Sequence, residues 1–252
     1  MQRRDFFRHS TLRVAGLLTA QVVLAGSYGR ASAQPTAEIA IFCQEEQADH
    51  PAIAGALRLL RESGRSFDVV HQLTALERYT VLLLPDVVRL SSIQAAQIDT
   101  YLSRGGRLLA SWQSGLTPDG SAFASHRFGL RVVGEARCSP DFVVPGPRLA
   151  SHTSSHAELL MYLRGMEVEV REASLLAVAY PPAPLAGAPQ PTSYPAVTLC
   201  NGVAYFAHPI FTQYAHTAPR WCGQLVLNAL DHLTKTHTGI PAPTLTGGRI
   251  VV

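Results

Sequence analysis

Charged side chains are scarce in this sequence, and the positive ones are unevenly placed. Only 15% of the 252 residues are charged, against 47% that are hydrophobic, so a sizeable core is expected and wholesale disorder is excluded. The first 33 residues hold five arginines against Asp5, a net of +4. Subtracting this from the formal charge of +3 leaves −1 for the remainder. A basic surface is therefore lacking, and no nucleic-acid partner is expected.

Cysteine pairs at metal-binding or redox spacing are also lacking. The chain has four cysteines but no C-x-x-C pair, which excludes a zinc ribbon and a thioredoxin-like motif. Cys43 and Cys200 lie in apolar runs typical of strands, which favours buried free thiols. His152 and His156 are four residues apart, a spacing that suits a metal on a helix, but their setting favours a solvated loop. We expect no metal and no cofactor.

The N-terminal residues have the features of an export signal. Arg3 and Arg4 begin RRDFFR, which closely resembles the twin-arginine motif, and an apolar region follows from Val14 to Ala25. Residues 31–33, ASA, fit a cleavage site, so cleavage is expected after Ala33. The expected location is periplasmic or extracellular. A weakly hydrophobic anchor helix is the alternative; no later run is long enough to span a membrane.

The stretch from Tyr79 to Gly115 organises the predicted fold. Residues 81–84, VLLL, form a continuous apolar run, which indicates a strand buried on both faces. Ser91 and Gln94 have the spacing of a capping box, and two glycines end the helix that follows, before a second apolar strand. Two buried strands joined by one helix form a parallel unit.

The sequence patterns that predict the other strands and helices are weaker, but they are consistent with an α/β domain. Strands are expected at residues 37–42, 67–72, 130–135, 141–144, 166–170, 175–180, 196–200 and 203–207, and helices begin at Pro51, near Phe123 and at Arg220. Asn201-Gly202 is a hairpin turn signal. The expected organisation is a signal peptide at 1–33, one domain at 34–238 with a β-rich insertion at about 130–195, and a tail at 239–252. The density of prolines between residues 181 and 195 predicts an exposed loop there.

Three blocks of the sequence resemble one known family. The blocks are YTVLLLPDVVRLSSIQAAQIDTYLSRGGRLLASWQSG, SPDFVVPGP and YPAVTLCNGVAYFAHPIFTQYAHTAPRWCGQLVLNAL, and together they resemble the β-galactosidase trimerisation domain over roughly residues 37–233. The resemblance implies a flavodoxin-like, class I glutamine-amidotransferase-like fold: a mostly parallel sheet with helices on both faces, plus the β-rich insertion. It also implies a role in subunit contact rather than in bond cleavage.

Catalysis by this chain on its own is not expected. In the family the module follows a (β/α)8 barrel, whereas here the predicted signal leads directly into it. Catalytic amidotransferase-like folds carry a nucleophile two residues before a glycine on a sharp elbow. Aligning Gly115 with that glycine places Gln113 at the nucleophile position, and an amide cannot attack a carbonyl. Gln113, Ser114 and Gly115 therefore indicate a relic elbow, with Ser111 and Ser114 out of register.

Polar residues expected at the strand ends provide the alternative hypothesis. Parallel sheets bind ligands at the carboxyl ends of their strands. Glu45, Asp86, Gln113 and His208 are predicted near those ends, and a strand-end cleft made by them would suit a stand-alone carbohydrate-active hydrolase or a carbohydrate-binding protein. Retaining glycosidases need two carboxylates about 5 Å apart. Solvated loop positions are the favoured interpretation of Glu45, Glu46 and Asp119.

The favoured hypothesis is an exported, non-catalytic module associated with glycoside hydrolases. It would act in subunit assembly or partner contact, either alone or as one part of a split or truncated glycosidase; a catalytic chain would be of β-galactosidase-related type. The expected partner is a second copy or a glycosidase barrel protein. Tyr214 and Trp221 are candidate interface residues, because aromatic side chains are enriched at interfaces. Core packing of Trp221 is the alternative.

Replacing Arg3 and Arg4 together by lysine should leave the precursor in the cytoplasm, since the arginine pair is what the twin-arginine route recognises. Cell fractionation with an antibody against the folded domain measures this. A matched Arg8→Lys, Arg13→Lys variant should be exported normally. Processing of the Arg3→Lys, Arg4→Lys precursor after Ala33 at the normal rate would contradict the assigned route.

Overall fold

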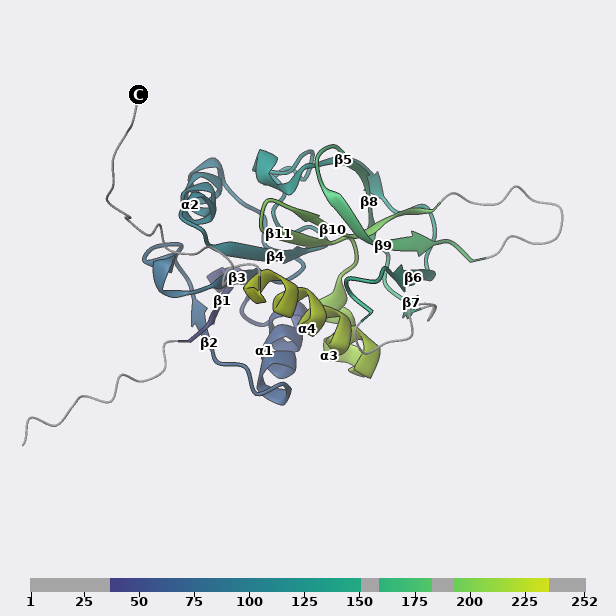
Figure 1. Ribbon diagram of the computed structural model, residues 1–252, viewed down its shortest axis with the longest axis horizontal. Coiled ribbons are helices and arrows are strands. Elements are labelled where there is room, and N and C mark those ends of the chain that lie inside the picture. Colours follow the sequence, from purple (N-terminus) through teal and green to yellow (C-terminus); the bar gives the residue numbers. More distant parts are fainter. Residues whose placement is uncertain (1–36, 151–158, 183–192, 236–252) are drawn as a thin grey trace, which may run out of the picture. The chain divides into compact units, whose positions relative to one another are not determined.

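The computed structural model describes residues 37–150, 159–182 and 193–235, which form a mixed α/β fold built on one large sheet (Figure 1). The predicted signal peptide and tail lie outside the described residues, as do His152, His156 and residues 183–192 of the proline-rich loop. Among the described residues, no helix is long and apolar enough to cross a membrane.

One half of the sheet is parallel. Its strand order is β2 (Phe67–Val70), β1 (Ile39–Phe42), β3 (Val81–Leu84), β4 (Arg107–Ser111) and β11 (Val203–Phe206). All four residues of β1, β3 and β11 are buried, as expected for strands covered on both faces. The expected parallel unit around residues 81–111 is confirmed, including the capping box, in which Gln94 N donates to Ser91 Oγ and Ser91 N to Gln94 Oε1.

The other half of the sheet is antiparallel. It continues from β11 through β10 (Tyr194–Cys200), β9 (Ser174–Tyr180), β6 (Asp141–Pro145) and β7 (Leu159–Met161). β5 (Leu130–Glu135) and β8 (Met166–Val170) form a separate two-stranded sheet. The expected hairpin at Asn201-Gly202 is present, with positive φ at both residues. The predicted β-rich insertion thus supplies most of the strands that widen the sheet.

Helices cover both faces of the sheet. α1 (Pro51–Glu62), α3 (Ile210–Thr217) and α4 (Arg220–Lys235) share one hydrophobic core with one face. α2 (Ser92–Ser103), the short 3-10 helix η3 (His126–Phe128) and the β5–β8 pair share the core of the other face. Pro51 begins α1, and His50 Nδ1 accepts from Ala52 N at 3.1 Å. Two further 3-10 helices are η1 (Glu45–Gln47) and η2 (Leu76–Arg78).

Three elements differ from the sequence prediction. The segment after His208, for which no helix was predicted, forms α3. β7 was not predicted, because its three residues carry no turn signal or alternation of their own. The short helix expected at 123–129 is limited to η3.

Gly55 lets α1 and α3 pack closely. A Cβ built at Gly55 would lie 2.0 Å from the backbone oxygen of Phe211, so the two helix backbones approach to a distance that no other residue permits. This contact fixes the start of α3 against α1.

Gly55→Ala should lower the free energy of unfolding by about 2 kcal/mol, since overpacking against backbone costs roughly 1–3 kcal/mol and outweighs the ~1 kcal/mol gain in helix propensity. Chemical denaturation measures the change. Ala54→Ser, at an exposed position of the same helix, is the control and should stay within about 0.5 kcal/mol. Equal or higher stability of Gly55→Ala would show that the helices are not in close contact.

Candidate functional site: the carboxyl ends of the strands

The crevice between β1 and β3 is where a ligand is expected. In open α/β sheets, ligands bind outside the carboxyl ends of the strands, at the point where the strand order reverses. β1 lies between β2 and β3, and the helices that follow β1 and β3 cover opposite faces, so the reversal falls there. Side chains after β1 bridge this crevice: Gln44 Nε2 donates to Arg89 O at 3.1 Å, and Gln47 Nε2 donates to Val87 O at 2.8 Å.

Asp86, directly after β3, is fully buried, and both its oxygens accept hydrogen bonds. Oδ1 accepts from Ser111 Oγ at 2.7 Å and from Phe211 N at 3.4 Å. Oδ2 accepts from the Thr212 amide at 2.6 Å and the Thr212 hydroxyl at 2.7 Å. Burial raises the pKa of the Asp86 carboxyl, and the donors from Ser111, Thr212 and Phe211 oppose that shift.

These contacts make Asp86 the cap of α3. Phe211 and Thr212 lie in the first turn of that helix, where amide groups have no acceptor within the helix. The N-cap residue Pro209 makes no side-chain hydrogen bond. A carboxylate from β3 therefore does what Ser, Thr or Asp normally does at the N-cap, and its charge suits a helix N-terminus. Asp86 is used within the fold and does not face an open cleft.

The predicted elbow after β4 has a different register from the one expected. The residue with left-handed geometry is Trp112, with φ 51°, and not Gln113. Gln113 N donates to Asp86 O at 2.8 Å, and its side chain accepts from Arg89 Nη2 at 2.8 Å. In the described chain, β4 is followed by turns and an isolated bridge rather than by a helix. The nucleophile-bearing strand-to-helix geometry is therefore not formed.

The serines and the glycine of this turn pack inside it. Ser111 and Ser114 are both fully buried, and Ser114 Oγ accepts from Val88 N at 3.0 Å. Gly115 has φ 85°, and a Cβ there would lie 2.2 Å from Cζ of Phe128. The glycine is required for packing against that ring.

His208, after β11, belongs to a buried polar cluster that sequence reasoning missed. Its Nε2 lies 2.9 Å from Asp141 Oδ1 and 3.3 Å from the Tyr194 hydroxyl, which also donates to Asp141. His208 and Asp141 are each only 1% exposed. Burial and the bond to Asp141 raise the pKa of Tyr194. Because Asp141 is 67 residues from His208 in the chain, no spacing pattern could have paired them.

The four residues of the predicted strand-end cleft do not converge. Glu45 is exposed, whereas Asp86 and His208 are buried with partners of their own. Within the described ranges, the backbone bond from Gln113 to Asp86 is the contact that joins two of them. The other acidic candidates, Glu46 and Asp119, are exposed, in line with the solvated interpretation. No group of three or more His, Cys, Asp or Glu within the described ranges could hold a metal ion.

Neither of the two aromatic residues predicted to lie at an interface, Tyr214 and Trp221, is fully exposed. Tyr214 is 7% exposed, and its hydroxyl donates to Glu62 Oε2 at 2.5 Å, between α3 and α1. Burial, with the Glu62 bond, raises the pKa of Tyr214 to about 12. Trp221, in the first turn of α4, is partly buried and packs against the core.

The predicted thiols are free, and Cys43 and Cys200 are buried as expected.

Asp86→Ala should lower the free energy of unfolding by about 3 kcal/mol or more, because each buried donor left without an acceptor costs about 1–3 kcal/mol. Urea denaturation measures the loss. Asp49→Ala, at an exposed position without a side-chain partner among the described residues, is the control and should change stability by less than about 0.5 kcal/mol. A loss for Asp86→Ala no larger than that of the control would mean that Asp86 does not hold α3.

Comparisons with known proteins give structural matches only. No family model matches the chain, and no curated protein sequence does. Among solved structures, α-L-fucosidase isoenzyme 2 from Paenibacillus thiaminolyticus is 25% identical, with a TM-score of 0.66 over 78% of this chain and 33% of the fucosidase. The cold-adapted β-galactosidase from Rahnella sp. R3 is 16% identical, with a TM-score of 0.57 over 79% of this chain and 31% of the enzyme.

A third match covers most of both chains. A ThuA-like protein from Bacteroides uniformis is 11% identical, with a TM-score of 0.62 over 82% of this chain and 95% of its own. This chain thus spans about a third of the two glycoside hydrolases and nearly all of the ThuA-like protein. The comparisons show a fold that occurs both within glycoside hydrolases and in a ThuA-like protein.

Proposed function

We propose that this chain is an exported, non-catalytic module that works in contact with a glycoside hydrolase or with a second copy of itself. Its fold is of the flavodoxin-like, class I glutamine-amidotransferase-like type, as in the β-galactosidase trimerisation domain. The strand order of the parallel half supports this, because it reads 2-1-3-4-5 when those five strands are numbered along the chain. The matched stretches of the fucosidase and the β-galactosidase support a glycosidase context.

One observation carries the non-catalytic part of the proposal. At the strand ends, where chemistry is expected in this type of sheet, Asp86 is fully buried and bound to the first turn of α3. The left-handed residue of the adjacent turn is Trp112, whose indole is neither a nucleophile nor a base. A buried carboxylate whose oxygens are already hydrogen-bonded, beside a turn without a nucleophile, is poorly suited to hydrolysis.

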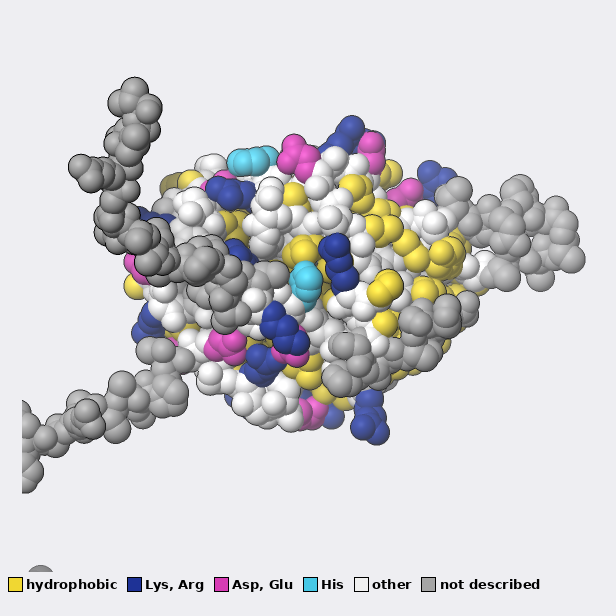
Figure 2. Space-filling view, in the orientation of Figure 1, with side chains coloured by type: hydrophobic (Ala, Val, Ile, Leu, Met, Phe, Trp, Pro, Cys, Tyr) yellow, Lys and Arg dark blue, Asp and Glu magenta, His cyan; other side chains and the backbone are white. Residues whose placement is uncertain are grey.

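An exposed apolar surface supports the contact part. Hydrophobic side chains gather on the side of the molecule where β8 and β9 lie (Figure 2). Val133, Val170, Leu175 and Tyr180, from β5, β8 and β9, are 36–50% exposed. Exposed apolar side chains that gather on one side of a molecule are typical of interaction sites. This surface, rather than Tyr214 or Trp221, is where we place the partner contact.

The export route is proposed on the N-terminal motif alone. Transport by the twin-arginine route and cleavage after Ala33 would bring the domain to the periplasm or the medium, where it would meet an exported glycosidase.

The experiment combines turnover with association. The purified chain should release no more product from aryl β-galactosides and aryl α-fucosides than buffer does. By light scattering behind a sizing column, it should be a dimer or larger, or it should form a complex when mixed with a glycosidase from the same cells. Leu175→Glu should weaken that association by about tenfold or more, because a buried charge in the contact is costly.

The control is Ile93→Glu, on α2, where the side chain is 72% exposed and lies away from β9. It should leave association unchanged. Enzyme-like turnover would overturn the non-catalytic proposal. A monomer at all concentrations that also binds no glycosidase, or equal effects of Leu175→Glu and Ile93→Glu, would overturn the contact proposal.

A further inference from the structure

The connection from β2 to β3 leaves one flank of α2 uncovered. Both strands pair in parallel with β1, and parallel strands are usually joined by a helix. Here residues 71–80 form an irregular segment of bends with only the short η2. Leu73, Leu76 and Tyr79 anchor the segment on the core beside α2. Since a helix is about 10 Å across and this segment is thinner, a space remains between the segment and α2.

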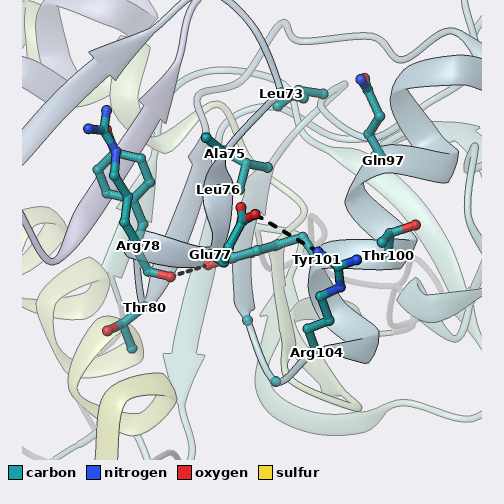
Figure 3. A pocket seen from close by; sticks show the side chains of 13 residues that line it. Leu73, Ala75, Leu76, Glu77, Arg78, Thr80, Gln97, Thr100, Tyr101 and Arg104 are labelled. Atoms are coloured by element: carbon teal, nitrogen blue, oxygen red, sulfur yellow. Dashed lines mark hydrogen bonds and ion pairs between the residues drawn. The ribbon is translucent and has the colours of Figure 1, made fainter.

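That space consists of two adjoining hollows. The first, about 290 Å³, lies between residues 73–80 and the side chains of Gln97, Thr100 and Tyr101 of α2 and of Arg104 just after it (Figure 3). The second, about 280 Å³, is lined by the start of the segment and by Gln94 and Gln97. Leu73 and Gln97 line both hollows, so the two adjoin along α2; together they are called here the α2 groove.

The walls of the α2 groove are mostly neutral and polar. Most of its polar side chains end in amides or hydroxyls, and those of Gln72, Thr74 and Gln97 make no hydrogen bond to another described residue. The lining also includes His71 and Arg78, and Arg78 pairs at 3.8 Å with Asp68, which does not line the groove. Glu77 and Arg104 face each other across the first hollow, with 3.9 Å between Oε1 and Nη1, so they largely neutralise one another. Leu73 and Leu76 give the groove apolar lining.

The geometry points to a short, neutral oligosaccharide as the ligand of the α2 groove. Amide groups both donate and accept, and so match sugar hydroxyls, which do the same. Paired opposite charges give no preference for an anion or a cation, and the apolar lining suits the C–H face of a pyranose ring. The two hollows together fall within the ~300–1,000 Å³ of a typical small-molecule site, which gives room for a ligand of two or more rings.

An extended peptide fits the groove less well. Peptides that bind in extended form usually pair with an exposed strand edge, whereas the groove lies between a helix and a segment that is not a strand. The inference does not rest on the proposed function, because it uses neither the strand-end residues nor the apolar surface of β8 and β9.

The test is a titration of the purified chain with four neutral tetrasaccharides, namely β-1,4-linked galactose, glucose, mannose and xylose. It is followed by amide chemical shifts in NMR, which locate the binding site. At least one tetrasaccharide should bind with a Kd of about 1 mM or tighter and shift residues 71–80 and 94–106. The shifts should be the same whether or not the chain is associated with a partner.

Gln97→Trp fills the point where the two hollows meet and should weaken binding at least about tenfold. Ala96→Trp adds the same bulk to the same helix at an exposed position that lines neither hollow, and should change the Kd less than about twofold. Thermal unfolding confirms that both variants fold. Binding by none of the four sugars, shifts confined to other residues, equal effects of the two tryptophans, or stronger binding of an unstructured octapeptide would each overturn the inference.

Discussion

The hydrogen bonds of one buried carboxylate hold the strand ends of this protein together. Asp86, at the end of β3, receives the hydroxyl of Ser111 from β4 and the first-turn amides of α3. An acceptor is required there, because the helix has no side-chain cap of its own. The same helix is pressed against α1 through Gly55. The position of α3, and with it the closure of this edge of the sheet, depends on that carboxylate.

At the carboxyl ends of the parallel strands, polar side chains are used within the fold. Side chains that would face a ligand in an open crevice are here engaged with the backbone of neighbouring elements, as Gln44 and Gln47 are. In the antiparallel half, Asp141 and His208 form a second buried cluster that joins β6 to the end of β11. Polar groups of the kind that perform chemistry elsewhere stabilise the fold here, and the proposed functional surfaces are the apolar surface of β5, β8 and β9 and the α2 groove.

Local sequence patterns predicted the central unit of β3, α2 and β4, whereas contacts between residues far apart in the chain could not be predicted. The apolar run of β3 and the capping box of Ser91 each act within a few residues, so pattern was sufficient. α3 was missed because its cap comes from a residue more than a hundred positions away. For the same reason the partners of His208 were not predicted, and Asp86, which was predicted in an open strand-end cleft, is fully buried.

Native-state hydrogen exchange of the Phe211 and Thr212 amides tests the central claim most directly. First-turn amides of a helix usually exchange quickly, because they have no acceptor within the helix. If Asp86 holds the strand ends closed, these two amides should exchange only through large openings, with protection close to that of core strands such as β3. Exchange as fast as that of exposed loop amides would show that this edge of the sheet is open, and that its polar groups are free to bind a ligand.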